Sequence, residues 1–297
     1  TCLCAGSALA QAKELKVGVI YDLTGPFAAG GSNASYLGTK YAIDMFNERG
    51  GAEGWKIKPV YADAQSKADV AINEYERLVN QEKVDMVMGV FSSAHCVPMA
   101  QKAEAAKKFM WANVCVASAV LKDKKMQYVF RAQVHSDQFG EASCTFLNEQ
   151  AKARLGKDPK DLKVAVIYED GPYGSGVASG NESACKGYGM QVVLKEGYAA
   201  TSPDLSPLVT KLKRARPDVI LHTGYNPDIT LFLRQAKEQN LKWAALIGHG
   251  AGEAGARLTL GSDSNTVIDM FAEARGLAMH ERLASGVRQG WSAGQLW

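Results

Sequence analysis

Two adjacent serines stand where a buried strand is expected to end and a helix to begin. The apolar run 84–90 is followed by Phe91, Ser92 and Ser93, and a helical pattern covers 97–108. Two hydroxyl groups and the free backbone N–H groups of a helix start form a natural seat for a carboxylate. The alternative is that Ser92 or Ser93 only caps the helix. The pair therefore indicates an anion-binding loop or a helix cap.

Aromatic and histidine side chains occupy similar positions after other apolar runs. Tyr173 and Tyr225 could each close an apolar wall over a ligand, although a tyrosine at a strand end also serves as packing. His95 and His249 could contribute hydrogen bonds, and exposed loop histidines are the alternative. Several such loops converging on one place favour a binding site for a small molecule.

The sequence lacks the usual patterns of a catalytic centre. Its five histidines form no H-x-H or H-E-x-x-H pair, and Gly174-Ser175-Gly176 is not the G-x-S-x-G of a nucleophile elbow. There is no phosphate-binding loop. We therefore expect a protein that is not an enzyme and needs no cofactor or metal.

One segment near the end argues for different chemistry. In RLTLGSDSN (257–265) a short apolar run delivers Asp263 at its tip, as in barrel enzymes that present a metal ligand. The segment 257–287 resembles part of the amidohydrolase-superfamily deaminases, especially formimidoylglutamate deiminases. However, one carboxylate cannot hold zinc, which takes about three protein ligands and a water. A helix cap near Thr266 is the favoured interpretation.

Apolar runs and helical periods alternate from residue 15 onward, which predicts βαβ units and parallel sheets. The alternation is interrupted by a connecting stretch with a crossing near 127–133 and then restarts, so we expect two successive α/β lobes. The strands are predicted at 15–22, 55–63, 84–90, 109–116, 162–170, 190–198, 218–225 and 244–250, and the helices at 35–51, 68–81, 97–108, 137–155, 174–186, 206–215 and 228–240.

Length and charge fit this organisation. A chain of 297 residues suffices for two domains, and a formal net charge of +3 with well-mixed signs does not suggest a nucleic-acid partner. Residues 1–12 are small and apolar with two A-x-A patterns, which indicates the remnant of a secretory signal peptide; an accidental composition is the alternative. No apolar run approaches the roughly 20 residues of a membrane span. We expect an exported protein.

Four cysteines lie outside this leader: Cys96, Cys115, Cys144 and Cys185. None has the C-x-x-C spacing of a zinc or redox site. In an exported chain an even number permits two disulfides, and buried thiols are the equal alternative.

At this point a family resemblance becomes clear. Residues 13 to about 252 resemble the periplasmic solute-binding proteins of the leucine/isoleucine/valine type, which serve ABC importers. The similar motifs are IYDLTGPFAAGG, MFNERGG, GVFSSAH, VFRAQVHSDQFGE, YEDGPYGSG and RARPDVILHTGYNPDITLFLRQAKEQNLK. The resemblance implies the type I periplasmic-binding fold: two parallel-sheet α/β lobes, expected at 13–121 and 122–253, that close a cleft on a small ligand.

The same resemblance implies roles for single residues. Ser92, Ser93 and Ala117 match the loops that hold the ligand's carboxylate. Cys115 matches a position whose backbone carbonyl helps to hold the amino group. Tyr173 and Tyr225 match aromatic residues of the second lobe.

The sequence departs from the family at one position. Gly250, beside His249, stands where members that bind amino acids place an acidic residue against the ligand's ammonium group. A buried ammonium without that counter-charge would cost several kcal/mol. We therefore expect a small carboxylate that lacks the ammonium, aromatic or aliphatic, or an amide.

The resemblance ends near Gly252, whereas binding proteins of this type continue and return to the first lobe. We expect a fold truncated at its C-terminus, with an atypical tail over 254–297 that either completes part of the first lobe or packs loosely.

These interpretations predict an extracytoplasmic receptor of an ABC importer, a monomer that closes about hinges near 122–134 and 251–256 and delivers its ligand to membrane permease subunits. A ligand-sensing regulatory domain of the same fold is the alternative, and a metal-dependent deaminase is suggested by the tail alone.

Overall fold

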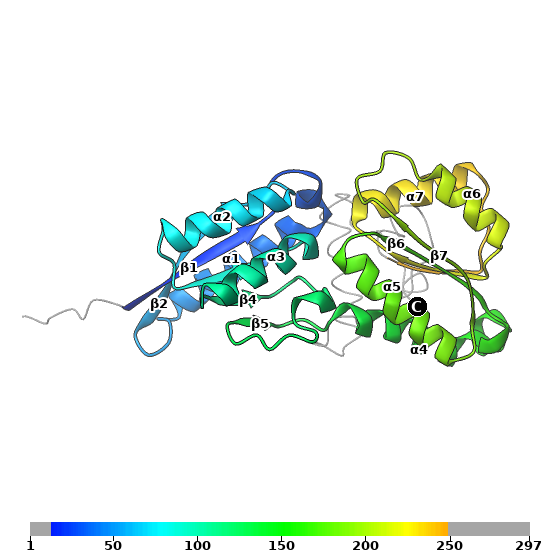
Figure 1. Cartoon of the computed structure of the whole chain (residues 1–297), viewed down its shortest axis with the longest axis horizontal. Coiled ribbons are helices and arrows are strands. Elements are labelled where there is room, and N and C mark those ends of the chain that lie inside the picture. The colour runs from blue at the N-terminus through cyan, green and yellow to red at the C-terminus, as the bar shows by residue number, and fades with distance from the viewer. Residues whose placement is uncertain (1–12, 249–297) are drawn as a thin grey trace, which may run out of the picture. The chain divides into compact units, whose positions relative to one another are not determined.

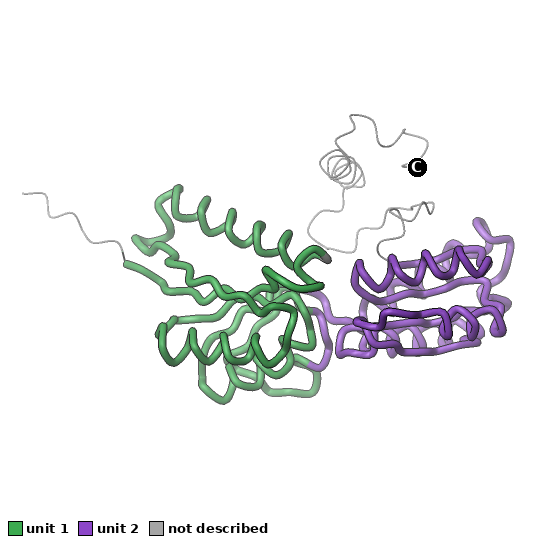
Figure 2. The backbone as a smooth tube through the Cα atoms, turned by 90° about the horizontal axis from the view of Figure 1, so that it is seen from above, with its two compact units in different colours: residues 1–115, 120–132 green, residues 116–119, 133–297 purple. Residues whose placement is uncertain are grey.

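The computed structural model describes residues 13–248, which form two compact units (Figure 2). Unit 1 contains residues 13–115 and 120–132, and unit 2 contains residues 116–119 and 133–248. None of the helices in 13–248 is both long and apolar enough to cross a membrane. The lobe boundaries expected from the sequence, at 121 and 253, stay a prediction.

Unit 1 is built on a five-stranded parallel sheet with the order β2-β1-β3-β4-β5 (Figure 1). The strands are β1 (Lys13–Tyr21), β2 (Trp55–Asp63), β3 (Met86–Gly89), β4 (Phe109–Ala112) and β5 (Val129–Arg131), and the helices are α1 (Asn33–Glu48), α2 (Ala68–Asn80) and α3 (Ser93–Ala105), with the short helical turn η1 (Ala28–Ser32). A second short turn, η2 (Ser118–Val120), has its first two residues in unit 2 and its last in unit 1.

Helices pack on both faces of this sheet, which explains the unbroken apolar run of β1. Val17 and Val19 pack in one cluster with Ile43 of α1. Gly18 faces the other way, and a Cβ there would meet the side chain of Leu78 of α2 at 3.0 Å. A strand with helices on both faces has no solvent side, so its residues read as a continuous hydrophobic segment.

Unit 2 has a four-stranded parallel sheet with the order β7-β6-β8-β9. Its elements are α4 (Ser136–Leu155), η3 (Pro159–Asp161), β6 (Lys163–Glu169), α5 (Pro172–Gly187), β7 (Gln191–Tyr198), α6 (Ser206–Ala215), β8 (Val219–Thr223), α7 (Asn226–Glu238) and β9 (Ala245–Ile247).

Alternate residues of β6 separate the two cores of unit 2. Val164 and Val166 pack with side chains of α4 and α5, whereas Ala165 and Ile167 pack with side chains of α6 and α7. This two-residue period places one helix pair on each face of the sheet.

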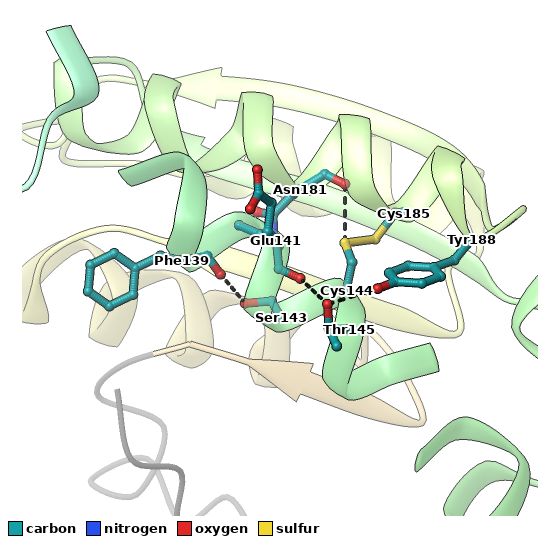
Figure 3. Close-up of a disulfide and its surroundings, with 9 residues drawn as sticks. Phe139, Glu141, Ser143, Cys144, Thr145, Asn181, Cys185 and Tyr188 are labelled. Atoms are coloured by element: carbon teal, nitrogen blue, oxygen red, sulfur yellow. Dashed lines mark hydrogen bonds between the residues drawn. A yellow bond between two sulfur atoms is a disulfide. The ribbon is translucent and has the colours of Figure 1, made fainter. Parts of the chain in front are cut away.

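Helices α4 and α5 approach each other closely and are joined by the disulfide Cys144–Cys185 (Figure 3). Gly140 permits the approach, because a Cβ there would lie 2.3 Å from the carbonyl oxygen of Val177. The amide of Asn181 donates to the carbonyl oxygen of Gly140 at 3.0 Å and spans the same interface. In unit 1, a second disulfide joins Cys96 and Cys115, so the four cysteines of residues 13–248 are all paired.

The predicted order of strands and helices is confirmed, with two differences. Strand β5 lies inside the predicted crossing, where only three residues pair with β4. Helix α3 begins at Ser93 and not near 97, so that Pro98 lies inside the helix.

The Gly140 contact predicts the effect of two matched substitutions. Gly140→Ala should lower the free energy of unfolding by about 1–3 kcal/mol, because the new methyl group overlaps backbone atoms of α5. Gly187→Ala, at a helical glycine with nothing within 4 Å, should leave it unchanged or raise it slightly. Urea denaturation measures both, and equal stability of the two variants would contradict the close-packing argument.

Candidate ligand-binding site

The loops after β1 and β2 meet at the carboxyl edge of the unit 1 sheet and are tied together by hydrogen bonds. The carboxylate of Asp63 accepts from the backbone N–H of Leu23 at 2.8 Å and from the hydroxyl of Thr24 at 2.7 Å. The hydroxyl of Ser66 accepts from the N–H of Phe27 at 3.0 Å. In parallel sheets this edge is where ligands bind.

Ser92 and Ser93 lie at this edge, at the start of α3. Ser92 is the N-cap residue, and its hydroxyl accepts from the N–H of Ala94 at 3.3 Å. Both serines are buried. The capping role is therefore observed for Ser92, and contact of either serine with a ligand stays a prediction.

A buried pair, Asp22 and His95, lies beside the first turn of α3. Asp22 Oδ1 accepts from the N–H of Ser66 at 2.9 Å and lies 3.4 Å from Nδ1 of His95, without a hydrogen bond between them. Burial raises the pKa of Asp22 to about 6, although the bond from Ser66 opposes the shift. Burial lowers the pKa of His95 to about 4, against the opposing charge of Asp69. At neutral pH the pair therefore carries one negative charge.

Sequence reasoning named His95 as a possible hydrogen-bonding residue but missed Asp22. An aspartate directly after an apolar strand was the available signal. Its neighbour His95, however, lies on helix α3. The two residues are far apart in the chain, so no local sequence pattern reveals that they meet.

Cys115 and Ala117, two residues apart, belong to different units. Cys115 is buried in unit 1 and held to α3 by its disulfide with Cys96. Ala117, also buried, belongs to unit 2.

Tyr173 and Tyr225 come together at the carboxyl edge of the unit 2 sheet. Tyr173 stands in the first turn of α5 and Tyr225 is the N-cap residue of α7, with ring centroids 5.7 Å apart and planes tilted by 54°. The two predicted aromatic positions thus form one pair, and their contact with a ligand stays a prediction.

Beside this pair lies a buried polar network that the sequence did not predict. The hydroxyl of Tyr198 donates to Oδ2 of Asp228 at 2.6 Å and lies 2.7 Å from Nε2 of His222. Because the hydroxyl has a single proton, Nε2 of His222 is the donor in the second contact. The other oxygen of Asp228 accepts from the N–H of Tyr225 at 2.8 Å, so the network holds the backbone of that residue.

A second buried carboxylate completes this edge. The two oxygens of Glu169 accept from the N–H groups of Gly171 at 2.8 Å and Gly174 at 2.6 Å. Burial raises the pKa of Glu169, of Asp228 and of the Tyr198 hydroxyl, the last also because Asp228 is adjacent.

Several predicted features fall outside the described residues: His249, Gly250, the second hinge at 251–256, the tail 254–297 with Asp263, and the leader 1–12. Within residues 13–248 no three His, Cys, Asp or Glu side chains gather as a metal site would require.

Comparison with known proteins shows which family has this architecture. The family model described as "Periplasmic binding protein" matches residues 14–273. The chain belongs to the periplasmic binding protein family. It is 38% identical over 250 residues to the Leu/Ile/Val-binding protein homolog 7 of Brucella suis, covering 84% of this chain and 62% of that relative. This binding protein thus spans less than two thirds of the relative's length.

Solved structures have the same fold. The branched-chain amino acid binding protein LivJ of Streptococcus pneumoniae, in complex with isoleucine, has a TM-score of 0.71 at 22% identity over 93% of this chain and 78% of its own. A solute-binding protein of R. palustris, in complex with 4-hydroxybenzoate, has a TM-score of 0.67 at 22% identity over 80% of this chain and 62% of its own. The type I periplasmic-binding fold with two parallel-sheet lobes is confirmed.

The family consists of binding proteins and not of enzymes. The match continues to residue 273, beyond the predicted limit near Gly252 and into the segment 257–287. The resemblance of that segment to an amidohydrolase is therefore not supported, and the deaminase alternative loses its basis.

The shifted pKa values of the buried pair predict how stability depends on pH. The folded-state pKa of Asp22 lies above its ordinary value of 3.8, so its ionised form destabilises the fold above about pH 6, and this cost disappears as the pH falls toward 4. Asp22→Asn should raise the free energy of unfolding at pH 8 by about 3 kcal/mol and leave it unchanged at pH 4. Urea denaturation across this range tests it; an equal effect at both pH values would contradict the assignment.

The Tyr198 network predicts a second effect on stability. Tyr198→Phe leaves a carboxylate oxygen of Asp228 without its donor in a buried site, which should cost about 1–3 kcal/mol. Tyr188→Phe is the matched control, because the Tyr188 hydroxyl meets Thr145 at the surface, and it should change stability by less than about 0.5 kcal/mol. Thermal unfolding distinguishes the two, and indistinguishable variants would count against the network.

Proposed function

We propose that this protein is the extracytoplasmic solute-binding receptor of an ABC importer, and that it captures a small carboxylate with an aromatic or aliphatic body. The observation that supports the proposal is that each unit has predicted ligand-binding residues together at the carboxyl edge of its sheet. Unit 1 offers Ser92, Ser93 and the N-terminus of α3, and unit 2 offers the Tyr173–Tyr225 pair.

These two edges suit the two ends of such a ligand. The positive end of the helix dipole at the start of α3 and the serine hydroxyls there favour a carboxylate. Tilted aromatic rings favour an apolar or aromatic body. The solved structures of the same fold hold isoleucine and 4-hydroxybenzoate. Both have a carboxylate on a compact apolar body, and isoleucine also carries an ammonium group. Cys115 and Ala117 then lie on the loop that also contacts the ligand. His249, which lies outside the described residues, is proposed as a further ligand contact.

The absence of an ammonium group from the ligand is supported by the carboxylates of unit 2. Each oxygen of Glu169 and of Asp228 accepts a hydrogen bond from the protein itself. These groups are engaged in holding their loops, and Gly250 supplies no charge. A carboxylate without an ammonium, or an amide, avoids the cost of an unpaired buried cation.

Capture proceeds by closure of the two lobes about hinges near 122–134 and 251–256, with ligand contacts stabilising the closed state. The receptor acts as a monomer after export and passes its ligand to the permease subunits of the importer.

A thermal-shift screen tests the ligand class. Benzoate, 4-hydroxybenzoate or isovalerate should stabilise the protein, by about 2.7 kcal/mol at a hundredfold excess over Kd, and leucine should not. Tight binding of leucine or valine without any response to the acids would contradict the proposed ligand.

A variant locates the site. Tyr173→Ala should weaken binding of the best aromatic acid by about tenfold or more, because one ring of the apolar wall is lost. Tyr41→Ala is the control, since Tyr41 is 65% exposed on α1 of unit 1. Calorimetry measures both, and an unchanged Kd for Tyr173→Ala would place the ligand elsewhere.

A further inference from the structure

The buried pair Asp22–His95 has hydrogen-bonding atoms that the protein leaves unused. Asp22 is fully buried and His95 is 2% exposed. Oδ2 of Asp22 and Nδ1 of His95 have no hydrogen-bond partner, although Oδ1 and Nδ1 are only 3.4 Å apart. Unsatisfied buried polar atoms are costly, so a pair of them at a binding edge calls for a functional reason.

The charged groups around the pair are acidic. Asp63, at the end of β2, raises the pKa of Asp22, and Asp69, in the first turn of α2, raises the pKa of His95. The remaining neighbours on the loops are neutral. The backbone N–H of Ser66 donates to the carboxylate of Asp22, and the backbone N–H of Asp22 donates to the hydroxyl of Ser32. The ring of Phe27 lies 6.0 Å from that of His95. No lysine or arginine of residues 13–248 forms an ion pair with either member.

This arrangement conflicts with an anion at Ser92 and Ser93. His95 stands in the first turn of α3, at the positive end of the helix dipole where the ligand's carboxylate would bind. An ionised Asp22 beside that turn repels a second negative charge, and burial strengthens the repulsion. One proton on the pair, on either Asp22 or His95, removes the conflict, because the two groups titrate together.

We propose that the Asp22–His95 pair takes up one proton when a ligand carboxylate binds at the start of α3, and that the pair thereby determines the charge of the ligand that the receptor accepts. This inference rests on the proposed function. It makes Asp22 and His95 specificity-determining residues: an anionic ligand binds together with a proton, and a neutral amide binds without one.

The direction of the pH effect follows. Above about pH 6 the free pair is ionised, so binding of an anion must draw a proton from solution and the affinity rises as the pH falls. The gain amounts to at most about tenfold per pH unit between pH 8 and 6, and it levels off where the free pair is already protonated.

Calorimetry of the wild-type protein tests this directly. Benzoate and its neutral isostere benzamide are titrated at pH 7.5 in two buffers of different ionisation enthalpy, and the Kd of each is measured from pH 8 to 6. For benzoate we expect proton uptake approaching one per site and a Kd that falls as the pH falls. For benzamide we expect neither.

Two variants assign the proton to the pair. Asp22→Asn should abolish proton uptake and bind benzoate at pH 8 about as tightly as the wild type does at pH 6. Asp69→Asn removes an exposed charge near His95 and should keep the uptake. Benzoate binding without proton uptake in the wild type, or with undiminished uptake in Asp22→Asn, overturns the inference. If neither probe nor leucine binds at any pH, the proposed function fails, and this inference fails with it.

Discussion

The parallel pairing of strands is the constraint on which the rest of this structure depends. Every connection between successive strands of a sheet, except that from β4 to β5, contains an α-helix, so both faces are covered and every strand ends at the same edge. Apolar residues can fill both faces, but the loops at the carboxyl edge must satisfy their own polar groups. Polar side chains accumulate there for this reason, Asp22, Asp63 and Ser66 in unit 1 and Glu169 and Asp228 in unit 2.

The two edges solve this problem in different ways. In unit 2 the carboxylates of Glu169 and Asp228 have a donor for every oxygen, and the resulting network holds the start of α7, where Tyr225 stands. In unit 1 the carboxylate of Asp22 keeps one oxygen without a donor. The edge of unit 2 is therefore a rigid support for aromatic rings. The edge of unit 1 retains a carboxylate, that of Asp22, whose charge can respond to what binds beside it.

Much of the fold could be predicted because its signals are local. The apolar runs of β1 and β6 and the helical periods of α2 and α6 span short windows, and these elements lie where the sequence predicts them. The sequence does not predict strand β5, because its three residues are too few to show the apolar pattern of a strand. The sequence pattern places the start of α3 too late, because the helical pattern is recognised only from Val97 onward, whereas the cap at Ser92 determines where the helix begins.

The sequence by itself determined the alternation of elements, the two α/β lobes and the family, since these depend on residue order and on motifs that neighbouring positions carry. Only the tertiary structure decided which cysteines pair, that Tyr173 and Tyr225 share one edge, and that Asp22 meets His95 and Tyr198 meets Asp228. These contacts join residues on different strands and helices. Hydrophobic packing of the sheets brings them together, and no spacing along the chain specifies such a meeting.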